Sequence, residues 1–216
     1  MRPDHGGITM SEWRDRLHNF WIDQGVVRLL WKNTAEIAPG VFRANQPNHK
    51  RLEEWQRKGL RSVLYLRGTA MGAPYRAEER ACAALGLSFH IFHMSAHRLP
   101  PAEQVLALIT LFREIEKPFV MHCRAGADRT GLASAIYLLA VAERPVPEAR
   151  AMLAARFGHW RWSSTGVLDQ MVLHYAAAHQ DSGIGFEDWI KTAYDPEAIT
   201  LSFKRQTLLT RIRTRD

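Results

Sequence analysis

The sequence contains only two cysteines, Cys82 and Cys123, which lie far apart in the chain. Two cysteines cannot build a disulfide framework, and their spacing is not that of a Cys-x-x-Cys metal or redox motif. Cys82 falls in an alanine-rich stretch predicted to be helical, where we expect a buried and unreactive thiol. Cys123 is therefore the cysteine that needs a chemical explanation.

Long hydrophobic runs are also missing. No apolar run reaches the roughly 18 residues that a membrane-spanning helix needs, and the N-terminal residues lack the apolar stretch of a signal peptide. We therefore expect a cytoplasmic protein without a transmembrane segment. With 216 residues, 46% of them hydrophobic and 24% charged, the chain is expected to form one main domain with a sizeable core.

Acidic residues are the scarcer charge: 22 Asp and Glu face 29 Lys and Arg, which leaves a net charge of +7. Such a charge favours anionic partners, namely phosphorylated substrates, nucleic acid or acidic lipid. No nucleic-acid recognition motif is present, so we expect no specific nucleic-acid partner, while peripheral contact with acidic lipid stays open. We expect the basic tail, 203–216, to be a solvated or frayed end.

Hydrophobic periodicity predicts strands that alternate with helices. The predicted strands are 41–44, 62–67, 87–94 and 116–121, and the predicted helices are 49–58, 75–85, 101–116, 132–142, 147–156, 164–179 and 185–194. This order predicts an α/β fold, with a central, largely parallel sheet of four to five strands flanked by helices. We expect a central domain at 36–180, a helical N-terminal extension at 1–35 with an amphipathic helix at 10–31, and a helical and basic C-terminal extension at 181–216.

The segment 122–131 reads HCRAGADRTG and lies between a predicted buried strand and a predicted buried helix. A strand, a tight loop and a helix N-terminus together form an anion site, because unpaired N–H groups and the helix dipole point into the turn. Cys123 at the mouth of this loop supplies a nucleophile where a phosphate would bind. The segment therefore predicts a catalytic site.

Several residues of the segment suit phosphate chemistry. The loop N–H groups and Arg129 favour the thiolate form of Cys123, and the planar guanidinium fits two phosphoryl oxygens. Gly126 lets the backbone turn its amides inward, and the Thr130 hydroxyl can donate a hydrogen bond to the cysteine sulfur. His122 is expected to order the loop by hydrogen bonds.

The pattern His122-Cys123-x5-Arg129-Thr130-Gly131 resembles the signature loop of the cysteine-dependent protein tyrosine and dual-specificity phosphatases. The resemblance is strong over 118–142 and looser over 40–177. It implies the fold of those phosphatases for the central domain, and a two-step reaction without metal or other cofactor. Cys123 would form a phosphocysteine that water hydrolyses. The phosphoryl group would be held by Arg129 and by the backbone amides of residues Arg124, Ala125, Gly126, Ala127, Asp128 and Arg129.

The resemblance leaves the substrate open. Phosphotyrosine proteins come first, because most members of the family act on them. Phosphoinositides or inositol phosphates are the alternative. Arg124 adds a positive charge to the loop, and Asp128 resembles the aspartate that lipid-acting members carry at this position. A catalytically weak phosphate-binding module is a further alternative.

The general acid is the point where the sequence departs from the family. Most members carry an aspartate on an upstream loop, but the corresponding stretch, 94–101, contains none. Asp128 resembles an aspartate found at this position in an atypical subgroup that includes the myotubularins, and we expect it to be the acid, with His97 as the second candidate. Asp128 could instead simply pair with a neighbouring base.

Two further groups of residues were weighed for a function. His90, His93 and His97 do not favour a metal site, because His90 and His93 point to opposite faces of the predicted strand. Trp160, Arg161 and Trp162 could line the pocket or stack on a ligand, but core packing is the expectation that we favour.

Overall fold

The computed structural model describes residues 33–68 and 72–213, with side chains described up to residue 206. The amphipathic helix predicted at 10–31 lies outside the described residues. The five strands are β1 (Ala35–Ala38), β2 (Val41–Asn45), β3 (Ser62–Tyr65), β4 (Ser88–Ile91) and β5 (Phe119–Cys123). They form one sheet in the order β1-β2-β5-β3-β4. Only the edge strand β1 is antiparallel to its neighbour, which confirms the predicted α/β fold with a largely parallel sheet.

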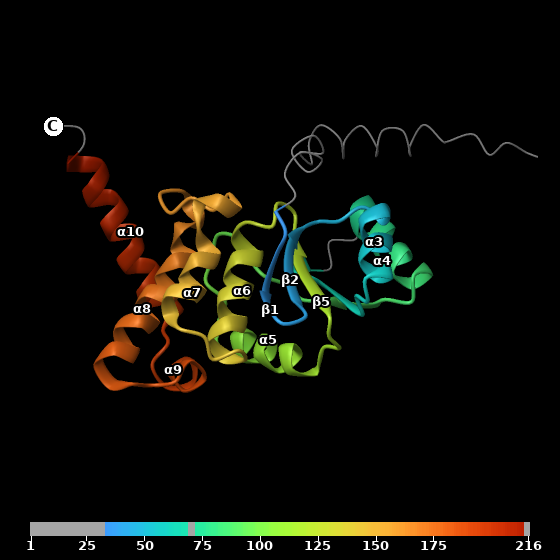
Figure 1. Cartoon of the computed structure of the whole chain (residues 1–216). Coiled ribbons are helices and arrows are strands. Elements are labelled where there is room, and N and C mark those ends of the chain that lie inside the picture. Colours follow the sequence, from blue (N-terminus) through green and yellow to red (C-terminus); the bar gives the residue numbers. More distant parts are fainter. Residues whose placement is uncertain (1–32, 69–71, 214–216) are drawn as a thin grey trace, which may run out of the picture.

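Helices cover both faces of the sheet (Figure 1). One face carries α3 (His49–Arg57) and α4 (Ala73–Ala84), and the other carries α5 (Ala102–Glu114), α6 (Asp128–Ala140), α7 (Val146–Arg150) and α8 (Val167–Ser182). Because side chains alternate along a strand, β5 serves both cores. Val120 packs with α3 and α4, while Phe119 and Met121 pack with α5 and α6.

Helix α6 is the central helix of the larger core. Every residue from Thr130 to Leu139 is buried, and the helix contacts β5, α5, α7 and α8. A helix that is covered on all sides has to be apolar all round, which explains its run of Ala and Leu. The packing therefore fixes the N-terminus of α6 directly behind the end of β5.

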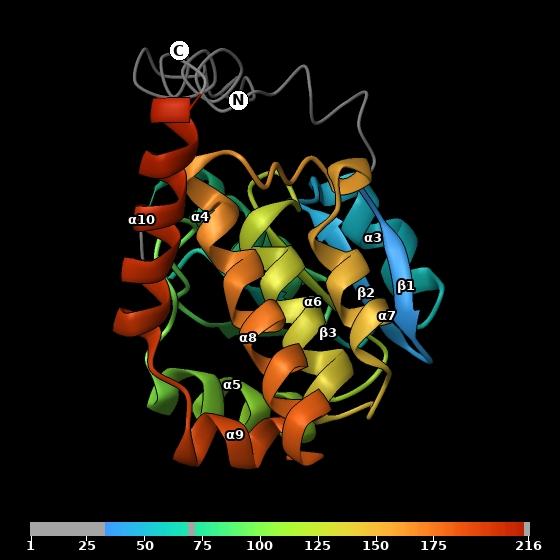
Figure 2. The same ribbon diagram turned by 90° about the vertical axis from the view of Figure 1, so that its left-hand side faces the viewer.

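The C-terminal stretch expected to be a solvated or frayed end is helical up to Arg213, and residues 204–206 are exposed to solvent. After α9 (Phe186–Thr192), helix α10 runs from Pro196 to Arg213 and packs against α8 (Figure 2). The Asp195 side chain accepts hydrogen bonds from the N–H groups of Glu197 and Ala198, at 3.0 and 2.9 Å. An aspartate N-cap followed by proline at the first helical position is a helix start signal, which the weak periodicity of this stretch concealed.

Several predicted boundaries also differ from the structure, for example β5 at Phe119–Cys123 against 116–121 and β4 at Ser88–Ile91 against 87–94. Strand β1 was not predicted, because four residues before the Pro39-Gly40 turn carry too short a pattern. Helix α6 begins at Asp128 and not at the predicted 132, so the last residues of the segment 122–131 belong to the helix. Asn48 caps α3 by accepting a hydrogen bond from the N–H of Arg51.

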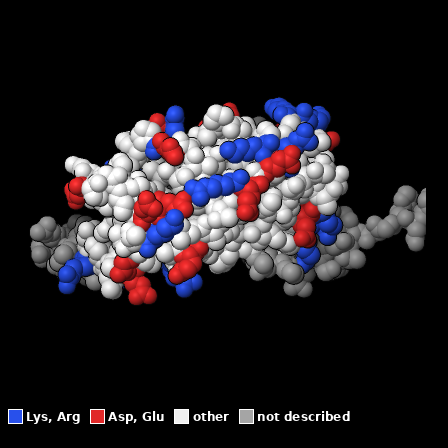
Figure 3. All heavy atoms as spheres, turned by 90° about the horizontal axis from the view of Figure 1, so that it is seen from below, with Lys and Arg blue, Asp and Glu red and all other residues white. Residues whose placement is uncertain are grey.

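Charges of both signs are interspersed over the described surface that is seen from the side of α5 (Figure 3). This face therefore offers no single-sign patch of the kind that binds a nucleic-acid backbone. None of the helices in the described ranges combines the length and the apolar character needed to cross a bilayer.

Candidate active site

Cys123 is the last residue of β5, the middle strand of the sheet, and its side chain is 3% exposed. The loop 124–127 follows, and α6 begins at Asp128. The first turn of a helix has N–H groups without intrahelical partners, and these groups and the helix dipole favour an anion at this end. The nucleophile and the anion site predicted from the sequence therefore meet at one bend of the backbone.

Arg129 and Thr130 follow Asp128 in the first turn of α6. Arg129 is partly exposed and makes no hydrogen bond or ion pair with a residue that the structure describes, so its guanidinium donors are available to an anion. Thr130 is buried, and its hydroxyl makes no hydrogen bond with a described residue. The hydrogen bond expected from Thr130 to the sulfur of Cys123 is therefore not formed in this structure.

The loop residues expected to surround the substrate differ in exposure. Arg124 is half-buried and Ala125 is exposed, while Gly126 and Ala127 are buried. Gly126 has φ +73°, and a Cβ on it would lie 2.6 Å from the carbonyl oxygen of Ala44. Only glycine combines this dihedral angle with such a close backbone approach.

Replacing Gly126 with alanine is expected to lower the free energy of unfolding by about 3 kcal/mol, since backbone strain and a collision add. Gly183 provides a matched control, because its φ is +71° and nothing lies within 4 Å of the position of its Cβ. Gly183→Ala should cost only about 1 kcal/mol, from the dihedral angle alone. Urea denaturation of both variants measures the difference, and equal losses would contradict the collision.

Arg43 on β2 supports the loop by a buried hydrogen bond, and this role was not predicted from the sequence. Its guanidinium is buried and donates hydrogen bonds to the carbonyl oxygens of Gly126, at 2.6 Å, and of Met152, at 2.7 Å. It also lies 3.6 Å from the centre of the Phe157 ring. Burial lowers the pKa of Arg43 to about 9, and the negative charge of the nearby Cys123 opposes this shift. A buried arginine needs such acceptors, but they come from segments far away in the sequence.

Two further contacts hold the loop backbone. The Asn33 amide donates to the carbonyl oxygens of Ala125, at 3.1 Å, and Phe157, at 2.7 Å. The N–H of Gln46, just after β2, donates to the carbonyl oxygen of Arg124 at 3.3 Å. With their carbonyl oxygens engaged outside the loop, the peptide groups are held in a fixed orientation.

His122 belongs to a buried polar network on the other face of the sheet. Its Nε2 lies 2.6 Å from the carboxylate of Glu78 on α4, and its Nδ1 lies 3.2 Å from the carbonyl oxygen of Cys123. Gln46 donates to the same carboxylate at 2.9 Å and accepts from Arg67 at 2.6 Å. The network links the end of β5 to α4.

Asp128 is paired with His159, which the sequence did not single out. His159 donates from Nδ1 to Asp128, at 2.7 Å, and from Nε2 to Asp169 on α8, at 2.5 Å. Burial disfavours the imidazolium, but the two carboxylates outweigh burial and raise the pKa of His159 to about 9. For Asp128, burial by itself would raise the pKa, but hydrogen bonds from His159 and Thr165 lower the pKa below its usual value. Asp128 thus pairs with a neighbouring base, and its role as the general acid stays a prediction.

His97, the second candidate acid, is exposed, and its Nδ1 lies 3.0 Å from the hydroxyl of Ser164. Within the described ranges, no group of three His, Cys, Asp or Glu side chains could hold a metal ion.

The expectation that Trp160 and Trp162 pack in the core is wrong. Their side chains are 45% and 79% exposed, and the two rings contact each other with centroids 5.1 Å apart. The segment that carries them starts at the buried His159, which ties it to Asp128. The tryptophans therefore form an exposed aromatic pair next to the candidate site.

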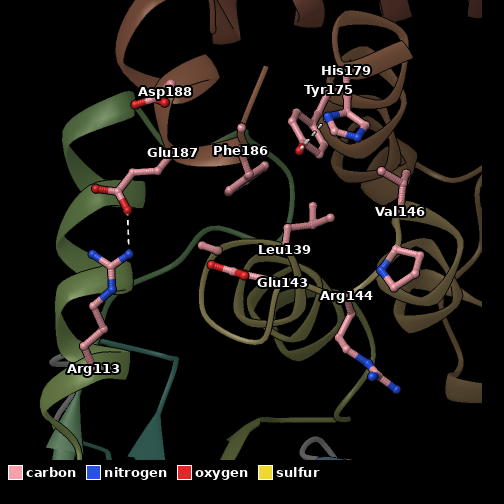
Figure 4. Close-up of a pocket in the computed structure, with 13 residues that line it drawn as sticks. Arg113, Leu139, Glu143, Arg144, Val146, Tyr175, His179, Phe186, Glu187 and Asp188 are labelled. Carbon is pink, nitrogen blue, oxygen red and sulfur yellow. Dashed lines mark hydrogen bonds and ion pairs between the residues drawn. The ribbon is translucent and has the colours of Figure 1, made fainter. Parts of the chain in front are cut away.

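A pocket of about 580 Å³ lies elsewhere in the molecule (Figure 4). It is lined by Leu139 and Glu143 at the C-terminal end of α6, and by α5, α8 and α9, where Arg113 donates to Glu187 at 2.6 Å. Helix α6 has 13 residues, which at 1.5 Å of rise per residue makes it about 20 Å long. The pocket lies at its C-terminal end, whereas Asp128 lies at its N-terminal end. The pocket is therefore not part of the candidate site.

Comparison with known proteins agrees with this geometry. The sequence profile of the tyrosine phosphatase family matches residues 42–145. TpbA of P. aeruginosa is 19% identical, with 69% of this chain and 91% of that chain covered and a TM-score of 0.52. The core catalytic domain of the S. cerevisiae PP-IP phosphatase SIW14 is also 19% identical, with 69% and 93% covered and a TM-score of 0.50.

Tk-PTP is 17% identical, with 67% of this chain and 97% of that chain covered and a TM-score of 0.52. No curated protein sequence matches the chain significantly. At these identities the structural likeness describes the fold, while the family profile covers both the predicted signature loop and the strands beside it. Residues 42–145, which include the predicted signature loop, therefore match the tyrosine phosphatase family.

Proposed function

We propose that the protein hydrolyses phosphomonoesters through a phosphocysteine intermediate on Cys123. One observation carries this proposal: Cys123 at the end of β5, the N–H groups at the start of α6 and Arg129 in its first turn lie along one bend of the backbone. Arg129 would bind two phosphoryl oxygens whose charge grows in the transition state.

The reaction would run in two displacements. In the first, the Cys123 thiolate attacks phosphorus, the bond from phosphorus to the ester oxygen breaks, and the leaving oxygen takes a proton. In the second, water attacks phosphorus and the sulfur leaves as thiolate. The buried hydroxyl of Thr130 would stabilise that thiolate by a hydrogen bond. The contacts of His122 with Glu78 and with the Cys123 carbonyl support the loop-ordering role expected for it.

The substrate proposed first is phosphotyrosine in proteins, in keeping with the family. The alternative is a phosphoinositide or inositol phosphate, which the half-buried Arg124 in the loop favours. The name of the similar PP-IP phosphatase SIW14 is in line with this alternative. A catalytically weak phosphate-binding module would have the same loop but no turnover.

Trapping the intermediate tests the proposal. The full chain is mixed with a ³²P-labelled phosphotyrosine peptide, in a buffer that contains a metal chelator, and is quenched in acid. We expect acid-stable label on Cys123 and continuous release of phosphate. Tight phosphate binding without label would instead indicate a binding module, and turnover that needs added metal would contradict the mechanism. The ratio of kcat/KM for the peptide to that for inositol lipids then assigns the substrate.

A further inference from the structure

We propose that Asp128, His159 and Asp169 work as one proton-carrying unit, in which His159 stores the proton that Asp128 delivers to the leaving group. His159 is thus a positioning residue that acts through Asp128, and Asp169 holds the histidine in place. The inference rests on the proposed function and deepens it, because it gives the expected general acid Asp128 a source of protons, where the upstream stretch 94–101 lacks an aspartate.

The geometry of the unit leads from the interior to the catalytic loop. His159 and Asp169 are buried, whereas the side chain of Asp128 is 27% exposed and precedes Arg129 in the first turn of α6. The two hydrogen bonds of the imidazole, 2.7 and 2.5 Å long, leave both ring nitrogens engaged with carboxylates. A proton on His159 can therefore reach the substrate only through Asp128.

The charges explain why Asp128 needs this partner. Despite its burial, the pKa of Asp128 is lowered by His159 and Thr165, so at neutral pH the carboxyl has lost its proton and cannot by itself be an acid. His159, with its pKa raised to about 9 against the opposing effect of burial, keeps its proton under the same conditions. The pair thus holds one transferable proton, which resides on the histidine.

The proton balances over the two displacements. In the first, the His159 Nδ1 proton moves to the Asp128 carboxylate and from there to the leaving oxygen, which departs as an alcohol and leaves His159 neutral. In the second, the attacking water gives its proton to Asp128 and so back to His159. The cycle therefore restores the imidazolium while the hydroxide becomes part of the released phosphate.

The groups that face the unit come from the segments packed around it. Arg161 places its Nε 3.1 Å from Oδ1 of Asp169, so both oxygens of that carboxylate are engaged. Thr165 adds a hydrogen bond to Asp128. Arg161 forms an ion pair with Asp169, and its position favours the orientation of Asp169 towards His159.

The dependence on the leaving group tests the unit. General acid catalysis matters greatly for a basic leaving group such as phenol and little for p-nitrophenol, which departs without a proton. For His159→Gln and Asp169→Asn we expect kcat/KM to fall about 100-fold with phenyl phosphate and only a few-fold with p-nitrophenyl phosphate. Both substrates are measured on the same sample, so the ratio does not depend on the folded fraction. An unchanged ratio would overturn the proposal.

Exposed residues of α8 give matched controls. His174→Gln and Asp181→Asn make the same chemical changes on the same helix as Asp169 but at its exposed surface. We expect the phenyl to p-nitrophenyl ratio to stay at the wild-type value in both. A matching fall in these variants would contradict a specific role of the unit.

A titration by NMR of the His159 ring adds a readout that requires no turnover. In the Cys123→Ser variant we expect the ring to stay protonated up to about pH 9, and to lose its proton at a clearly lower pH once Asp169→Asn is added. Titration near the ordinary value of histidine in the first variant would overturn the inference. Absence of a trapped phosphocysteine would instead refute the proposed function, so the two failures are distinguishable.

Discussion

The Cys123→Ser variant is expected to lose all measurable turnover of phosphomonoesters while it still binds phosphate. In the proposed mechanism Cys123 supplies the sulfur that bonds to phosphorus, whereas the anion would be held by Arg129 and by backbone N–H groups of the loop and of α6, which the substitution does not touch. A serine hydroxyl in the same place is a far weaker nucleophile, because the thiol ionises at a much lower pH. Steady-state kinetics and phosphate titration by calorimetry measure the two properties separately.

Cys82 is the matched control for this experiment. It is also buried and unpaired, but it lies on α4, where burial, aided by the charge of Glu78, raises the pKa of its thiol to about 12. A thiol that stays protonated is not a nucleophile, so Cys82→Ala should retain the wild-type kcat/KM. Activity that survives in Cys123→Ser and disappears in Cys82→Ala would refute the assignment of the nucleophile.

Arg129→Lys is expected to lower kcat/KM about 1,000-fold, although the positive charge is retained. The guanidinium can donate two parallel hydrogen bonds to one phosphoryl group, whereas an ammonium donates from a single point. Because Arg129 has no described partner in the free protein, the substitution should leave the free energy of unfolding nearly unchanged. Kinetics together with urea denaturation therefore separate a catalytic defect from a structural one.

Arg144→Lys makes the same change beyond the other end of α6, where the arginine pairs with Glu148 on the surface. We expect wild-type kinetics for it, because exposed ion pairs contribute little. A loss at Arg129 no larger than the loss at Arg144 would mean that phosphate is bound by the backbone alone.

The sequence predicted the local unit that carries the candidate site. Cys123 and Arg129 lie on one strand–loop–helix unit, as their spacing predicted, and their catalytic roles stay predictions. Arg43 and His159 could not be found in this way, because each acts on the loop through contacts 83 and 31 residues apart in sequence. An arginine in a predicted strand and a histidine in a loop carry no local signal of their partners.

The fold shows the same division. The alternation of strands and helices was enough to predict the parallel sheet, since each crossover shows its own periodicity. The edge strand β1 was not predicted, because it is only four residues long. The bounds of helix α10 were not predicted, because this helix depends on packing against α8. The exposure of Trp160 and Trp162 likewise depends on tertiary structure, because the local sequence of a loop does not distinguish a buried aromatic residue from an exposed one.

The position of the tryptophan pair has a consequence for redesign of the enzyme. Trp160 follows His159 directly and Trp162 is two residues further on, so the exposed aromatic pair and the proposed proton store share one short stretch of backbone. Loop exchanges that replace this pair in order to alter substrate selectivity are expected to shift the imidazole relative to Asp128 as well. Selectivity and leaving-group protonation should therefore change together in such chimaeras, whereas single side-chain replacements at Trp162 leave that backbone in place.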